Sequence, residues 1–219
     1  MDTEFTNKRA ETFLNNFSSG LSKEMYVPDE FAKFFHWAGA NNCMGISNSG
    51  ENFIVVDPRV LGPSYISSLM IHKPLEDPWW LGSENPRHNS RLKVFAKTGA
   101  DGSSAAFWLD EKGEQQIVHL GSGSGSTMIG KWVDSPLDFL RLLAIGYAQL
   151  CWPEEYDRLP SELIDEGEMF HQPTRLRSWL EKEFDVVIPK RASDIVNDMS
   201  EIGKESSDPF CKWVDAVRG

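Results

Sequence analysis

The apolar and polar positions along the chain follow two spacings, one typical of strands and the other of helices. Short stretches rich in β-branched, aromatic and alternating apolar residues predict β-strands. These stretches lie at residues 52–56, 91–97, 105–109, 116–120 and 127–133. The polar sequence at 110–113 has the composition of a tight turn, so we expect it to close a hairpin between two of these strands.

The most apolar helical pattern runs from Ser135 to Tyr147. Ser135 suits the N-cap position, Pro136 suits the first helical position, and Asp138 suits the positive end of the helix dipole. The residues that follow are apolar on nearly every side, apart from Arg141. A helix of this kind is buried, so we expect it to be the core helix on which the preceding strands pack.

Weaker periodic patterns predict further helices. These lie at residues 7–17, from Pro28 onward, at 63–72 over Tyr65, Leu69 and Met70, at 173–184 and at 208–217. Residues 73–89 are rich in proline and aromatic residues, and we interpret them as a long loop.

The chain has 219 residues, of which 40% are hydrophobic, enough for a globular core. Its formal net charge is −11. Such a charge repels phosphate backbones and anionic lipids, so the sequence argues against direct nucleic-acid or membrane binding and favours a basic protein partner. A second interpretation is that the acidity serves only solubility.

Three cysteines lie far apart, at positions 43, 151 and 211, which suits a reducing compartment. The first residues are polar, and no apolar run approaches the roughly 20 residues of a membrane span. We therefore expect a soluble, cytoplasmic protein.

No motif in the sequence points to catalysis. The GSGSGS stretch at 121–126 lacks the lysine of a P-loop, the third glycine of a dinucleotide-binding loop and the serine of a nucleophile elbow. The histidines, His119 among them, are scattered without metal-ligand spacing. We therefore expect no metal, no cofactor and no enzymatic activity, and we interpret 121–126 as a connection between strands.

Two stretches are candidates for a functional surface. The first comprises Glu76, Asp77, Trp79, Trp80 and the nearby Glu84. Adjacent tryptophans cannot easily both point inward, and an exposed tryptophan among acids suits contact with a basic partner, although anchoring of both rings in the core is the simpler interpretation. The second is the acidic run at 154–168, for which a solvated surface is the simpler explanation.

Four segments in a fixed order resemble the SUKH superfamily, which comprises fungal cell-wall-assembly regulators and bacterial immunity proteins. The segments are VPDEFAKFF at 27–35, TGADGSSAAFWL at 98–109, IVHLGS at 117–122 and SPLDFLRLLAIG at 135–146. The resemblance implies an α+β fold with a twisted, largely antiparallel sheet backed by helices. It places a SUKH-like domain at 1–152, followed at 153–219 by an acidic linker and a helical C-terminal extension packed on it.

The resemblance also implies a function in protein binding. Bacterial members neutralise a cognate secreted toxin, often a nuclease or deaminase, and a basic toxin would complement an acidic inhibitor. Two alternatives stay open at this point. One is a regulatory adaptor for an endogenous partner, and the other is a small hydrolase or nucleotide-binding enzyme that uses the 121–126 loop.

Overall fold

The computed structural model describes residues 3–47, 50–56, 69–164 and 169–219. Within these ranges the α-helices are α1 (Thr3–Gly20), α2 (Asp29–Ala40), α3 (Pro78–Leu81), α4 (Pro86–Asn89), α5 (Pro136–Leu143), α6 (Thr174–Phe184) and α7 (Pro209–Arg218). The strands are β1 (Met44–Ile46), β2 (Asn52–Val55), β3 (Met70–Leu75), β4 (Leu92–Lys97), β5 (Ser104–Leu109), β6 (Gln115–Leu120), β7 (Met128–Val133) and β8 (Ser200–Glu201). Short 3-10 helices cover Pro153–Glu155, Pro160–Glu162 and Ala192–Asp194.

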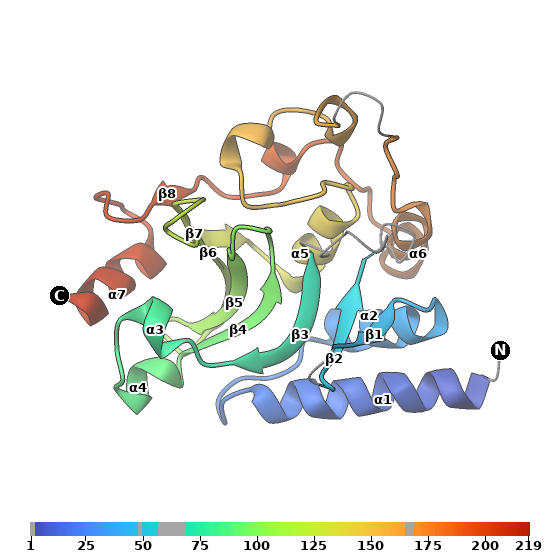
Figure 1. The fold of residues 1–219 in the computed structure, drawn as a ribbon, viewed down its shortest axis with the longest axis horizontal. Helices are drawn as coiled ribbons and strands as arrows, with labels where there is room; N and C mark the ends of the chain where they lie inside the picture. Colours follow the sequence, from blue (N-terminus) through green and yellow to red (C-terminus); the bar gives the residue numbers. More distant parts are fainter. Residues whose placement is uncertain (1–2, 48–49, 57–68, 165–168) are drawn as a thin grey trace.

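The strands of the described residues form a single antiparallel sheet in which spatial order follows chain order from β1 to β8 (Figure 1). Each strand pairs antiparallel with the next. The connections from β4 to β5 and from β5 to β6 are short, as this pairing favours, whereas residues 134–199 lie between β7 and β8. Together with the helices packed on it, this sheet confirms the predicted α+β class.

The larger core lies on the sheet face that carries Phe95 and Phe107, whose rings stack at 4.3 Å between centroids. Side chains alternate between faces along a strand, so Phe107 faces this core while its neighbours Ala106 and Trp108 face the other side. Helices α1, α2, α5 and α6 all bury residues here, among them Phe17, Phe31, Phe139 and Leu180.

A smaller core lies on the opposite face, against α3 and α7. Trp108 of β5 contacts Phe210 and Trp213 of α7, with ring centroids 5.3 and 5.7 Å away, and Leu81 of α3 is fully buried beside them. Residues after position 152 therefore complete both cores, because α6 joins the larger one and α7 covers the smaller one.

Helix α5 begins as predicted. Ser135 is its N-cap and accepts a hydrogen bond from the backbone N–H of Asp138 at 3.1 Å, with Pro136 at the first helical position. The helix ends at Leu143 rather than near Tyr147, and Gly146 then takes a positive φ of 105°. The apolar residues that follow the helix stay buried even so, including Ala144 and Ile145.

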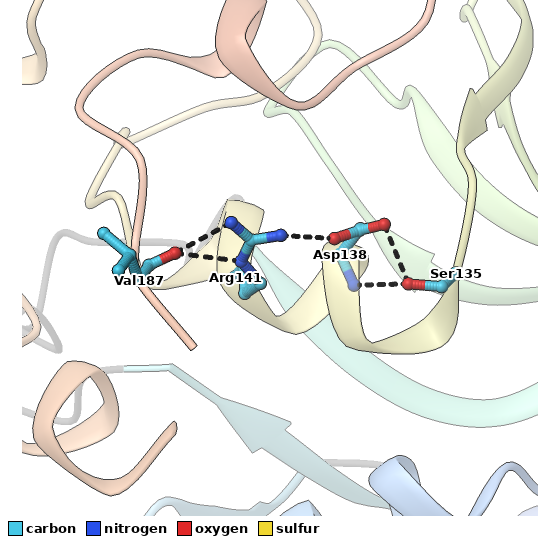
Figure 2. A network of polar contacts seen from close by, with 4 residues as sticks. All are labelled: Ser135, Asp138, Arg141 and Val187. Atoms are coloured by element: carbon cyan, nitrogen blue, oxygen red, sulfur yellow. Dashed lines mark hydrogen bonds and ion pairs between the residues drawn. The ribbon is translucent and has the colours of Figure 1, made fainter. Parts of the chain in front are cut away.

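A polar network ties α5 to the chain segment that follows α6 (Figure 2). Arg141 donates from Nη1 to Oδ1 of Asp138 at 2.7 Å and from Nη2 and Nε to the carbonyl of Val187 at 2.8 and 3.1 Å. The planar guanidinium thus joins the N-terminal turn of α5 to residue 187 with fixed geometry.

Several predicted elements differ in the structure. Helix α1 is longer than expected, since it continues to Gly20. The helix predicted over 63–72 is wrong where it can be compared, because Met70 begins strand β3, and Tyr65 lies outside the described residues. The loop predicted at 73–89 contains the end of β3 and the one-turn helices α3 and α4. Strands β1 and β8 were not predicted, since each is only two or three residues long.

Candidate functional site

The turn at 76–82 connects the end of β3 to the segment before β4, and it contains α3. Asp77 caps α3 by accepting a hydrogen bond at Oδ1 from the backbone N–H of Trp80 at 2.8 Å, and Pro78 occupies the first helical position. Gly82 ends the helix in the left-handed region at φ 67°, where glycine carries no Cβ penalty. The local sequence therefore specifies a single helical turn.

Trp79 and Trp80 point in different directions from this turn. Successive residues on a helix lie about 100° apart, so with Leu81 buried, Trp79 falls on the outer side. The side chain of Trp79 is 88% exposed, whereas Trp80 is half-buried and donates from Nε1 to the carbonyl of Gly121 at 2.7 Å. Of the two tryptophans predicted as partner contacts, the structure leaves Trp79 available and uses Trp80 internally.

The three predicted acids also differ in their surroundings. Glu76 forms an ion pair with Lys93, with Oε1 and Nζ 2.6 Å apart, and the Lys93 side chain is only 9% exposed. Asp77 serves as the helix cap, as described above. Glu84 is exposed. The exposed side chains near Trp79 in the chain include Glu76, Glu84 and the apolar Leu75, and we name the exposed side chains of Leu75, Glu76, Trp79 and Glu84 the Trp79 surface.

The 121–126 loop lies between β6 and β7, as predicted, and it closes around Asp101. Oδ2 of Asp101 accepts hydrogen bonds from the hydroxyl of Ser122 at 2.9 Å and from the backbone N–H of Ser126 at 2.8 Å. Ser103 donates to the same carboxylate from its backbone N–H and its hydroxyl. A Cβ on Gly125 would lie 2.7 Å from the Asp101 side chain, so glycine permits this close approach.

The hydrogen bonds to Asp101 have an electrostatic consequence. Burial acts to raise the pKa of this carboxyl, but the donors from Ser126, Ser103 and Ser122 outweigh it and lower the pKa to about 2. A protein carboxylate thus occupies the place where a phosphate-binding loop would hold its ligand. The N–H groups of Ser122, Gly123, Gly125 and Ser126 all donate to protein acceptors within this arrangement.

His119 lies next to this loop on β6 and is fully buried. Its Nδ1 lies 3.0 Å from the carbonyl of Met128, which can only accept, so Nδ1 carries the proton. Nε2 then accepts from the hydroxyl of Thr98 at 2.8 Å. Burial lowers the pKa of His119 to about 4, although the Met128 carbonyl and Asp101 act to raise it.

The second candidate stretch, 154–168, is only partly described. Glu162 accepts from the backbone N–H of Leu159 at its own 3-10 helix, and the carbonyl of Glu162 accepts from Arg158. Glu154 and Asp157 are exposed. The acids at 165, 166 and 168 lie outside the described residues. The described part therefore combines local capping with a solvated acidic surface.

Sequence reasoning missed two residues that shape this region, Asp101 and Arg218. Asp101 sits before a glycine in the stretch TGADGSS, which signals a turn but not the loop that it organises 20 residues later. Arg218 lies over the ring of Trp80, with its guanidinium carbon 4.5 Å from the centroid. No local sequence signal could have indicated that contact, because 138 residues separate the two positions.

Within the described ranges, no group of three or more His, Cys, Asp or Glu side chains could hold a metal ion. Among the same residues, no helix is both long enough and apolar enough to cross a bilayer. Comparison of the chain with protein-family models, with curated proteins and with solved structures finds no match. The resemblance to the SUKH superfamily therefore stays a prediction.

Proposed function

We propose that this protein is a cytoplasmic immunity protein of the SUKH type, which binds a cognate secreted bacterial toxin and neutralises it by non-covalent occlusion. The proposed toxin is basic, as a nuclease would be. The proposal rests on the resemblance stated above and is supported by the Trp79 surface.

The observation that carries the proposal is the exposure of Trp79. Its side chain is 88% exposed although it sits on a turn that is capped by Asp77 and anchored through Trp80. A large aromatic ring held in water by a fixed backbone loses little conformational freedom when a partner covers it. Tryptophan is also among the residue types most enriched in binding hot spots, which makes Trp79 a suitable centre for an interface.

Charge supports a basic partner. The chain carries a net charge of −11, and Glu76 and Glu84 flank Trp79 on an exposed surface. Glu84 is exposed and could form an ion pair with a cation of the partner. Glu76 already pairs with Lys93 through Oε1, so only its second carboxylate oxygen could contact the partner. An acidic rim around an aromatic centre would both steer a basic protein and complement it at contact.

Three side chains of types that often take part in catalysis, those of His119, Asp101 and Cys151, are in states that do not suit catalysis. This supports a function in binding. The two ring nitrogens of His119 are hydrogen-bonded to Thr98 and Met128. The Asp101 carboxylate is surrounded by donors from Ser103, Ser122 and Ser126. Burial and the nearby Asp101 raise the pKa of the Cys151 thiol to about 12, which suppresses the nucleophilic thiolate.

A regulatory adaptor would use the same surface for an endogenous partner, so the identity of the neighbouring gene separates the two functions: a toxin-domain gene directly beside this one favours immunity. The nucleotide-binding alternative conflicts with a loop in which the amides of Ser122, Gly123, Gly125 and Ser126 already donate to protein acceptors. It is tested by melting the protein with and without nucleotides, and an upward shift would revive it.

The decisive experiment is co-expression with the product of the adjacent gene. We expect the protein to rescue growth and to co-purify with the toxin, and the toxin recovered from the complex to have an unchanged mass. A Trp79→Ala variant that folds normally should lose both rescue and co-purification. Absence of rescue by the wild-type protein would reject the proposal, and a covalently modified toxin would reject the mechanism.

A further inference from the structure

The turn that presents Trp79 is too short to be stable alone. Helix α3 has four residues, and an isolated helix of that length is strongly disfavoured because nucleation costs more than one turn recovers. Its orientation must therefore come from contacts with the rest of the protein. Leu81 supplies one, since it is fully buried in the smaller core.

Trp80 supplies the second set of contacts. Its Nε1 donates to Gly121 at the start of the 121–126 loop, and its ring lies parallel to that of Phe210, with 6.5 Å between centroids and 5° between planes. Phe210 belongs to α7 and is fully buried. The inner side of the α3 turn thus packs on α7, and Figure 1 shows the two helices side by side.

Arg218, in the last turn of α7, also lies over the ring of Trp80. Its guanidinium carbon lies 4.5 Å from the ring centroid, within the range of a cation–π contact, and its Nη2 donates to the backbone carbonyl of Trp80. A Cβ on Gly82 would meet Arg218 Cγ at 3.5 Å, so the arginine stem also touches the end of the turn. One side chain therefore contacts the ring of Trp80, its carbonyl and the helix end.

We infer that Arg218 is a positioning residue for the partner-binding turn: it clamps Trp80 and thereby fixes the direction in which Trp79 faces solvent. The inference assigns to the C-terminal helix α7 a role in binding through a segment more than 100 residues away in the chain. It rests on the proposed function for the statement that Trp79 contacts the partner. The clamp itself is a property of the unbound protein.

The clamp is tested first on the protein alone, by hydrogen–deuterium exchange with mass spectrometry. Arg218→Met removes the guanidinium but keeps an apolar stem, and Lys212→Met is its matched control, since Lys212 is exposed on the same helix and carries the same charge. We expect peptides covering 78–83 to exchange at least about tenfold faster in Arg218→Met. The control should exchange as the wild type does, and both variants should melt as the wild type does. Unchanged exchange in Arg218→Met would overturn the inference.

The second measurement is binding to the purified product of the adjacent gene. We expect Arg218→Met to dissociate several-fold faster than Lys212→Met, because a loosened turn must be ordered again on binding. If Trp79→Ala weakens binding while Arg218→Met does not, the positioning role is overturned although the surface is correct. If exchange at 78–83 rises but neither Arg218→Met nor Trp79→Ala affects binding, the clamp stands and the proposed contact surface is rejected.

Discussion

The hydroxyl of Thr98 donates a hydrogen bond to Nε2 of His119 over 2.8 Å inside the larger core. Thr98 directly follows the last residue of β4, and His119 lies on β6, so this contact links the end of β4 to a strand on the other side of β5. Burial disfavours the charged ring and keeps His119 neutral, and in this form Nε2 accepts the hydrogen bond from Thr98.

The burial of His119 predicts a pH dependence of stability. The pKa of His119 is lowered to about 4 in the folded protein, against 6.5 for an unperturbed histidine. As the pH falls, the unfolded chain therefore binds a proton at this histidine before the folded protein does. The stability of the folded protein is unaffected by this group above pH 6.5 and decreases progressively between pH 6.5 and 4. The free energy of unfolding should decrease by about 3 kcal/mol over this range. Urea unfolding of the wild type and of His119→Gln at several pH values in this range measures this decrease. An equal dependence of the free energy of unfolding on pH in the two proteins would contradict the prediction.

The stability of the 121–126 loop should depend on the negative charge of Asp101. Asp101→Asn replaces an acceptor oxygen by a donor NH₂ opposite groups that themselves donate, so we expect a loss of about 2–3 kcal/mol in the free energy of unfolding. The wild type should also lose stability as the pH falls from 3.8 toward 2, because the folded-state pKa of Asp101 is lowered to about 2. Asp157→Asn, at an exposed position, is the control and should change stability by less than about 0.5 kcal/mol. A similar effect of the two substitutions in chemical denaturation would contradict the role given to Asp101.

Leu143→Asp should unfold the protein. The Leu143 side chain is 4% exposed in the larger core, and an unpaired carboxylate there costs several kcal/mol, comparable with a total stability of about 5–15 kcal/mol. Leu143→Met keeps the volume and should cost less than about 1.5 kcal/mol. Circular dichroism melts report both, and a cooperative transition in the aspartate variant would be incompatible with the burial of α5.

Trp79→Ala should weaken binding to the toxin by at least about 2 kcal/mol while leaving the melting temperature unchanged, since Trp79 is 88% exposed. Tyr26→Ala is the matched control, because Tyr26 is 59% exposed and its backbone pairs with Gln115 at the far end of β6 from Gly121. Glu84→Ala, at the rim, should cost well under 2 kcal/mol. The affinities of the three variants for the immobilised toxin test these expectations. Equal affinities of Trp79→Ala and Tyr26→Ala would remove Trp79 from the interface.

Association should be sensitive to salt. With a net charge of −11 and a basic partner, raising the ionic strength to about 0.15 M shortens the Debye length to about 8 Å and should slow association far more than it changes dissociation. Stopped-flow mixing at several salt concentrations separates the two rates. An association rate independent of salt would mean that the charge of the chain does not steer this encounter.

Local signals were sufficient to predict several elements of this protein. Ser135, Pro136 and Asp138 specified the start of α5 because capping depends on residues within one turn of each other. The strands from β4 to β7 followed from their alternation and turns, and the α+β class followed from the resemblance. The two short strands and the one-turn helices were missed, because so few residues carry no detectable period.

The tertiary structure alone decided how the candidate surface is built. The sequence places two identical side chains at positions 79 and 80, and only the packing of Leu81 and Phe210 makes one of them exposed and the other an anchor. The same holds for Asp101, which organises a loop 20 residues away, and for Arg218, which covers a ring 138 residues away. Such contacts depend on the path of the whole chain, because residues far apart in the sequence meet only in the folded structure and neighbouring residues do not indicate them.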